Sequence, residues 1–183
     1  MENKKVYIGI DPGSAGAIVL IDSDRNVLEM MSTPKNGKEY DLQSICIFLN
    51  KLKNMKNVHA ALEDVHAFQG SGATSNFNFG RGKMLWEMGL MAFKIPHTLV
   101  QPRKWQNVAW EGVTKTMVST SRKKKNGESV KKVDTKATSL TAVQRLYPDV
   151  DLRDPNRKTD RSKKPHDGVI DALLIAEYAR RSF

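Results

Sequence analysis

The sequence predicts an α/β domain in which a mixed sheet is flanked by helices. Short apolar runs of strand length near the start, apolar residues at helical spacing later, and acids at the ends of two strands indicate this class. At 183 residues, 39% hydrophobic and 27% charged, the chain is typical of one soluble globular domain. We therefore expect a single domain, residues 1–183, with basic loop insertions near residues 115–135 and 151–164.

The first 32 residues are predicted to form an antiparallel meander of three strands. The apolar runs Val6–Ile10 and Ala17–Ile21 flank the sequence Asp-Pro-Gly-Ser-Ala-Gly, which is rich in turn signals, and Val27–Ser32 follows a second turn. Asp11 stands at the end of the first strand. A buried carboxylate there costs free energy unless a cation meets it. The alternative is that Asp11 only caps the turn.

A helix and a further strand are expected next. Asp41 is a predicted N-cap, and apolar residues recur at helical spacing to about Lys53. The run Val58–Leu62 has the length of a strand and is followed by Glu63. If this strand lies beside the first and parallel to it, Asp11 and Glu63 meet at one edge of the sheet, where open α/β sheets place their sites.

The rest of the chain alternates helices with long polar segments. Residues 64–81 are rich in Gly, Ser, Thr and Asn and are predicted to be a functional loop. Helices are expected at Gly82–Lys94, Pro102–Trp110, Thr135–Tyr147 and His166–Arg181, and a short strand at Thr98–Val100. The segments Lys115–Lys136 and Asp151–Lys164 are basic and poorly apolar. We expect solvated loops there, the first of them mobile.

Charge and composition narrow the class of function. The net charge of +10 favours a polyanionic partner, and nucleic acid is the usual one; charge that serves only solubility is the alternative. The single cysteine, Cys46, is expected to be a small buried side chain, and four scattered His offer no zinc-site spacing. The chain shows neither a bilayer-spanning run nor a signal peptide, so we expect a cytoplasmic protein without membrane contact.

The last predicted helix adds two acids. Asp167 and Asp171 are four residues apart, so they share one helix face, where like charges are unfavourable unless a cation lies between them. Asp167 alone is also consistent with a first-turn acid favoured by the helix dipole. Asp11, Glu63, Asp167 and Asp171 together are hard oxygen ligands that suit Mg²⁺ or Mn²⁺. In a basic protein, this set predicts a metal-dependent nuclease.

Three motifs in this order resemble a known family. They are the Gly-Ile-Asp-Pro-Gly-Ser opening at Gly9–Ser14, the acid Glu63, and the helix His-Asp-Gly-Val-Ile-Asp-Ala-Leu at His166–Leu173. Over nearly its whole length the chain resembles the RuvC-type Holliday-junction resolvases of the RNase H-like, or retroviral-integrase-like, superfamily. The resemblance implies an RNase H-like five-stranded mixed sheet. The length and the basic insertions resemble phage-encoded members.

The resemblance also implies roles for the acids. Asp11 would bridge two Mg²⁺ or Mn²⁺ ions in each active site, with Glu63 and Asp171 as further ligands. Asp167 would be the partner of Asp171, because the position three residues before Asp171 is a glycine. His166 is the alternative partner of Asp171. It is also a candidate contact to a DNA phosphate.

The implied activity is that of a homodimeric endonuclease acting in recombination, repair or phage DNA processing. Each subunit would nick one strand of a four-way DNA junction at symmetric positions and leave 5′-phosphate ends. The alternatives are a debranching nuclease that cuts flaps, Y-junctions and forks, and an inactive junction-binding module. A phosphotransferase with the actin-like fold would need a second glycine-rich phosphate hairpin and a much longer chain.

Further residues are expected to contact DNA. Lys104 or Lys115 would contact the scissile phosphate, although each is equally consistent with a solvated surface lysine. Phe68 is expected to stack on unpaired bases, Phe77 to share that role or anchor the loop, and Phe79 to anchor it. The remaining candidates are basic side chains expected to bind phosphates: Arg81, Lys83, Arg122, Lys123, Lys124, Lys125, Lys131 and Lys132.

Two pairs of residues carry more specific expectations. Arg81 and Lys83 stand at the start of the predicted central helix, where the helix N-terminus would add to their attraction for phosphate. Trp105 and Trp110 lie at helical spacing, and we expect them to be core or dimer contacts rather than base-stacking residues.

Overall fold

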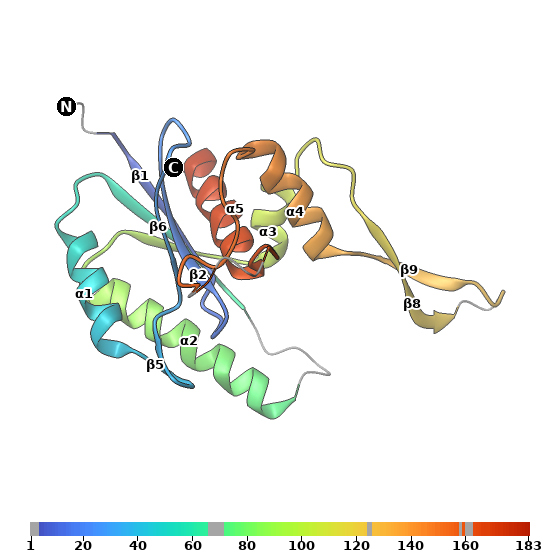
Figure 1. The fold of residues 1–183 in the computed structure, drawn as a ribbon, viewed down its shortest axis with the longest axis horizontal. Coiled ribbons are helices and arrows are strands. Elements are labelled where there is room, and N and C mark those ends of the chain that lie inside the picture. Colours follow the sequence, from blue (N-terminus) through green and yellow to red (C-terminus); the bar gives the residue numbers. More distant parts are fainter. Residues whose placement is uncertain (1–3, 66–71, 124–125, 158, 160–162) are drawn as a thin grey trace.

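A five-stranded mixed sheet forms the centre of the computed structural model, which is described for residues 4–65, 72–123, 126–157, 159 and 163–183 (Figure 1). The strand order is β3-β2-β1-β6-β7. The strands are β1 (Val6–Ile10), β2 (Ala17–Asp22), β3 (Val27–Ser32), β6 (Val58–Glu63) and β7 (His97–Val100). The first three form the antiparallel meander, and β6 and β7 continue the sheet parallel to β1. The predicted mixed five-stranded sheet is confirmed.

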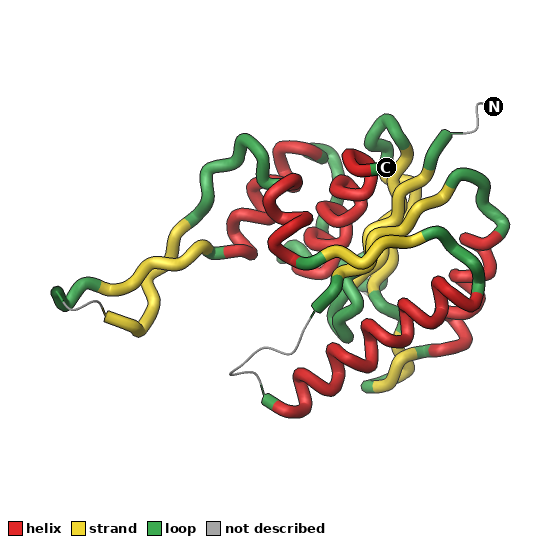
Figure 2. The backbone as a smooth tube through the Cα atoms, turned by 180° about the vertical axis from the view of Figure 1, so that it is seen from behind, coloured by secondary structure: helices red, strands yellow, loops and turns green. Residues whose placement is uncertain are grey.

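Helices cover both faces of this sheet (Figures 1 and 2). The helices are α1 (Leu42–Lys53), α2 (Ala73–Ala92), α3 (Pro102–Ala109), α4 (Thr135–Leu146) and α5 (Asp167–Ser182). α3, α4 and α5 lie on one face, where α5 runs along β1 and β2, and α1 and α2 lie on the other. No described helix combines the length and the apolar character needed to cross a membrane.

Alternate side chains of the central strands divide between two cores. Val19 and Ile21 of β2 pack with α3, α4 and α5, whereas Ile18 and Leu20 pack with α1 and α2. This division follows from the two-residue period of a strand. Because both faces are covered, β1 and β2 are buried along their whole length, which explains why their sequences are continuously apolar rather than alternating.

Gly9 allows α5 to rest directly on β1. A Cβ atom at this position would collide with the backbone of α5, at the carbonyl oxygen of Ala172 and the amide nitrogen of Ala176. The missing side chain therefore sets how closely the last helix approaches the sheet. It also sets the position of Asp171, the residue before Ala172.

Helix α2 begins at Ala73, so the prediction of a loop over residues 64–81 is wrong for its second half. Gly80 and Gly82 lower the intrinsic helix propensity of this stretch. Packing outweighs that cost, because Gly82 lies against the β1–β2 loop, where a Cβ atom would collide with the carbonyl oxygen of Pro12. Helix α2 therefore packs beside the β1–β2 loop.

The predicted solvated loop at Lys115–Lys136 is instead a two-stranded hairpin. It consists of β8 (Met117–Lys123) and β9 (Ser129–Val133), paired antiparallel. The Asn126-Gly127 pair lies between the strands, and Gly127 has a φ of 84°. Asn-Gly is a strong hairpin signal. The many lysines around it are, however, typical of a solvated loop, which is what the composition of the segment predicts. A second, minor hairpin joins β4 (Lys35–Asn36) and β5 (Glu39–Tyr40).

Candidate active site

The carboxyl ends of β1 and β6 bring Asp11 and Glu63 together. In the parallel register Ile10 lies opposite Leu62, so the next residue of each strand stands at the same edge of the sheet. The expected meeting of these two acids is thereby confirmed. Glu63 is buried, with 8% of its surface exposed.

The start of α5 carries Asp167 and Asp171 to this edge. Gly168, between them, lies against the β1–β2 loop: a Cβ atom there would be 2.5 Å from the carbonyl oxygen of Ala15 and 2.7 Å from the Cα of Gly16. Only glycine fits this approach without displacing the loop. The glycine that separates the two acids is thus what seats the helix N-terminus beside Asp11.

Three of the acids line one open cavity of about 430 Å³: Asp11, Asp167 and Asp171. Phe79 of α2 and Lys136 of α4 line the same cavity, which we call the acid pocket. The Lys136 ammonium group lies 2.5 Å from Oδ2 of Asp167. The acid pocket therefore has a cation at its rim, beside the most exposed of its carboxylates.

Two buried indole groups lie behind the acids, one in direct contact with an acid and one linked to an acid through a serine. The Trp105 indole N–H donates to Oε1 of Glu63 at 2.8 Å. Asp171 is hydrogen-bonded to the Ser139 hydroxyl, whose oxygen accepts from the Trp110 indole N–H at 3.3 Å. Of the two roles expected for both tryptophans, core or dimer contacts, the structure shows the first, since they are 1% and 6% exposed. Their contacts with the acid cluster were missed, although a buried indole N–H usually has a partner.

Burial and mutual repulsion raise the pKa values of the acids. Burial, and after it the charge of Asp11, raises the pKa of Glu63 to about 8 against the hydrogen bond from Trp105. The same two causes raise the pKa of Asp171 to about 7. Burial also raises the pKa of Asp11, against the hydrogen bond from the Gly13 amide. A cation among these carboxylates would relieve the repulsion.

The chemistry of the four acids suits a divalent cation. Four carboxylates are hard oxygen ligands of the kind that Mg²⁺ and Mn²⁺ take. Within the described ranges, however, no group of three or more His, Cys, Asp or Glu is arranged so that it could hold a metal ion. Each carboxylate instead has its own partner, as with Gly13 for Asp11 at 2.9 Å. Metal binding would require these carboxylates to come closer together than they lie in this structure.

The lysine of the acid pocket is not one that the sequence indicated. Lys104, on α3, and Lys115, before β8, are both exposed, and neither lines the acid pocket. Lys136 does. Nothing in the sequence separates Lys136 from the other lysines of its basic segment, because only the return of the chain through the β8–β9 hairpin brings it to the edge of the sheet.

Arg81 and Lys83 lie inside α2 rather than at its N-terminus, so the predicted help from a helix N-terminus is wrong. Arg81 forms an ion pair with Glu39, and Lys83 forms one with Asp64. A phosphate that binds either cation would compete with these carboxylates. Their role as phosphate contacts stays a prediction.

The aromatic residues near the site divide by exposure. Phe77 is 65% exposed on α2, and the Arg81 guanidinium lies over its ring, 5.8 Å from the ring centre. Phe79 is 38% exposed and lines the acid pocket. Phe68, together with Lys124 and Lys125, lies outside the described residues. Base stacking stays a prediction for both Phe68 and Phe77.

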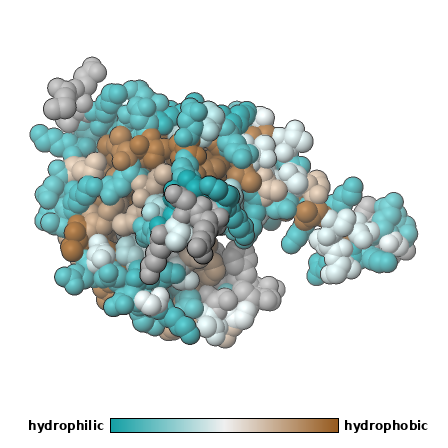
Figure 3. Space-filling view, viewed as in Figure 1, coloured by the Kyte–Doolittle hydropathy of each residue, from teal (hydrophilic) through white to brown (hydrophobic). Residues whose placement is uncertain are grey.

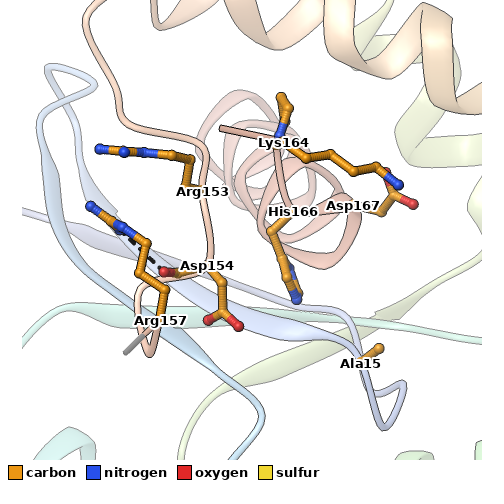
Figure 4. Close-up of a pocket in the computed structure, with 8 residues that line it drawn as sticks. Ala15, Arg153, Asp154, Arg157, Lys164, His166 and Asp167 are labelled. Atoms are coloured by element: carbon orange, nitrogen blue, oxygen red, sulfur yellow. Dashed lines mark hydrogen bonds between the residues drawn. The ribbon is translucent and has the colours of Figure 1, made fainter. Parts of the chain in front are cut away.

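A second cavity, of about 390 Å³, lies next to the acid pocket and shares Asp167 with it (Figure 4). His166 forms part of its wall and caps α5, accepting a hydrogen bond from the Val169 amide at Nδ1 over 3.2 Å. Figure 4 shows the His166 ring between Asp154 and Ala15. Burial raises the pKa of Asp11, and the Coulombic effect of His166 opposes this rise.

Solved structures of RuvC from Thermus thermophilus share this fold. The chain is similar to RuvC in complex with a Holliday-junction substrate, with a TM-score of 0.51 and 13% identity over 95% of this chain and 91% of that one. A second T. thermophilus RuvC structure gives a TM-score of 0.51 and 17% identity, with 94% and 92% covered. The sequence matches no family model and no curated protein. The expected likeness to RuvC is confirmed at the level of the fold.

Proposed function

We propose that this protein is a metal-dependent endonuclease that resolves four-way DNA junctions by paired nicks. What supports the proposal is the acid cluster: Asp11, Glu63, Asp167 and Asp171 gather at one edge of a sheet with the RuvC-like fold. The net charge of +10 fits a nucleic-acid substrate. The similar T. thermophilus RuvC is bound to a Holliday junction, which supports the class of DNA.

The four carboxylates would hold two Mg²⁺ or Mn²⁺ ions, which when bound supply an activated water and stabilise the leaving oxygen. Around them, the Trp105 indole orients Glu63, and the Ser139 hydroxyl orients Asp171. The Lys136 ammonium group would attract the scissile phosphate to the rim of the acid pocket. Hydrolysis would leave a 5′-phosphate and a 3′-hydroxyl.

End-labelled four-way junctions, incubated beside linear duplex, flap and Y-fork with Mg²⁺, Mn²⁺ or EDTA, test the proposal. Metal-dependent, symmetric, paired nicks on the junction alone are the expected result. Equal cutting of flaps and forks would assign the protein to general debranching instead. Tight junction binding without cutting in either metal would make it a binding module.

Lys136→Gln is expected to slow junction cleavage by about 100-fold, the order found when one charge-stabilising donor is removed from a catalytic site. Gln keeps most of the side-chain length but loses the charge that lies 2.5 Å from Asp167. Single-turnover cleavage rates measure the effect. Lys104→Gln is the matched control, because Lys104 is exposed and outside the acid pocket. If Lys104→Gln slows cleavage and Lys136→Gln does not, the phosphate contact would be assigned to Lys104 on α3 instead.

We propose further that the enzyme acts as a homodimer joined through α2. Three exposed apolar side chains form a ridge on one face of this helix: Met84, Met88 and Met91. Beside the ridge lies a groove of about 790 Å³ between α1 and α2, lined largely by apolar side chains. Cys46, expected to be buried, is exposed in this groove. A ridge and a groove on one face would allow two copies of the chain to fit together about a two-fold axis.

Met88→Lys is expected to convert the dimer to a monomer, because it places a charge in the centre of the apolar ridge. Sedimentation velocity measures the state of association, and junction cleavage should change from paired to single nicks. Leu28→Lys is the control, since Leu28 is similarly exposed, at 50% against 55% for Met88, but lies on β3. A wild-type protein that sediments as a monomer at micromolar concentration would contradict the proposal.

A further inference from the structure

The β8–β9 hairpin, Met117–Val133, projects from the body of the protein. Figures 1 and 2 show it extending beyond α4, away from the sheet, and in Figure 3 it forms a separate, mostly hydrophilic lobe. Its longer strand, β8, has seven residues. A strand of this length spans about 23 Å, at about 3.3 Å per residue.

The root of the hairpin is fixed beside the acid pocket. The Asp134 amide donates to the Thr116 carbonyl oxygen at 2.8 Å, and the Thr116 amide donates to the Thr138 hydroxyl oxygen at 3.1 Å. Asp134 also caps α4 by accepting from the Ala137 amide. The first turn of that helix carries Lys136, which lines the acid pocket. The direction of the hairpin is thereby coupled to the site.

The hairpin offers basic side chains on both faces. Its described part carries Arg122, Lys123, Lys131 and Lys132 against one acid, Glu128. Residues paired across an antiparallel ladder share a face. Lys131 pairs with Ser119 and Lys132 pairs with the adjacent Val118, so these lysines point to opposite faces.

Neither face therefore has a continuous apolar surface that another protein could cover. Met117, at 49% exposure, is the one large exposed hydrophobic residue of the described hairpin, and it lies at the root. A narrow, two-sided basic ribbon is suited to a polyanion with charges spaced along its length. Duplex nucleic acid is such a polyanion.

We propose that the β8–β9 hairpin grips the phosphate backbone of one duplex arm of the branched DNA that enters the acid pocket. This inference rests on the proposed nuclease function. A reach of about 23 Å corresponds to about seven base pairs at 3.4 Å each. The hairpin thus requires an arm of at least that length, and it holds the arm without reading sequence, since phosphate contacts position rather than specify.

The test compares four-way junctions whose arms have 5 or 12 base pairs and are closed by loops, bound in Ca²⁺ and followed by fluorescence anisotropy. The wild-type protein is expected to bind the longer arms at least fivefold more tightly. The triple variant Arg122→Gln, Lys131→Gln, Lys132→Gln is expected to lose this preference. Raising the salt from 50 to 200 mM lowers the affinity of the wild-type protein for the junction. If the variant loses three phosphate contacts, its own fold-decrease over this range should be about 40 times smaller.

The matched control removes the same charge at the opposite edge of the sheet. Lys53, Lys56 and Lys94 are exposed near the amino end of β6, and Gln at all three should leave the arm-length preference intact. The inference would be overturned if the hairpin variant kept the preference for longer arms, or if its affinity fell equally for both junctions. Tighter binding of RNA than of DNA arms through the hairpin would also overturn it. If the wild-type protein neither binds nor cuts any branched DNA, the proposed function itself fails.

Discussion

Asp11→Asn is expected to reduce junction cleavage by about a thousandfold or more, while junction affinity stays within about twofold. The magnitude is the order seen when a charge that acts in the transition state is removed. Asn preserves the size of the side chain, and its amide oxygen can still accept from the Gly13 amide at the 2.9 Å position. The β1–β2 loop should therefore survive. The substitution removes a proposed metal ligand, not a phosphate contact.

The same variant has a second readout that a purely structural role would not produce. The charge of Asp11 raises the pKa of both Glu63 and Asp171, so its removal should lower both pKa values in metal-free protein. Carboxyl NMR titration measures this shift, and calorimetry with Mn²⁺ measures the loss of metal affinity.

The control for Asp11→Asn is the same substitution at Asp24, which lies in an exposed turn and pairs with Lys4. It should leave cleavage unchanged. Loss of junction binding together with cleavage in Asp11→Asn would show that Asp11 supports the DNA-binding surface, and would count against its place in the proposed metal site.

The sheet and the acids could be predicted because each rests on local sequence. Central strands covered on both faces must be apolar along their length, so Val6–Ile10 and Ala17–Ile21 are visible as strands. Acids directly after such runs are conspicuous, and parallel pairing of β1 and β6 then brings Asp11 and Glu63 to one edge.

Features that depend on contacts distant in sequence could not be predicted. The start of α2 depends on the packing of Gly82 under Pro12, which outweighs weak helix propensity. Lys136 reaches the acid pocket only because the β8–β9 hairpin closes and returns the chain to the sheet. Trp105 contacts Glu63 across two separate elements, and no spacing in the sequence encodes that contact.

The far end of α5 contains a buried ion-pair network that holds the helix in place. Glu177 is fully buried and accepts hydrogen bonds from Arg25, Arg180 and Arg181 at 3.0, 2.7 and 2.7 Å, and from the Tyr147 hydroxyl at 2.9 Å. One carboxylate thus joins α5 to the β2–β3 turn and to the end of α4. Because α5 also carries Asp167 and Asp171, this network anchors the helix that places two of the acids.

Glu177→Gln is expected to lower the free energy of unfolding by about 3–5 kcal/mol, the range for removing one partner of a buried ion pair. Three guanidinium groups would then lose the buried carboxylate that they share. Urea unfolding, followed by circular dichroism, measures the loss. Glu111→Gln is the control, since Glu111 is exposed and pairs only at the surface with Arg181; a change below about 1 kcal/mol is expected.

The dependence of stability on pH provides an independent measure of the same network. Burial alone would raise the pKa of Glu177, but hydrogen bonds from Arg180, Arg181, Arg25 and Tyr147 outweigh it and lower the pKa from 4.5 to about 2. A carboxyl with a lowered pKa stabilises the folded state fully above pH 4.5. That contribution, about 3 kcal/mol, is lost as the pH falls from 4.5 towards 2. Glu177→Gln should lack this part of the acid sensitivity, and an identical slope in both proteins would show that Glu177 does not carry it.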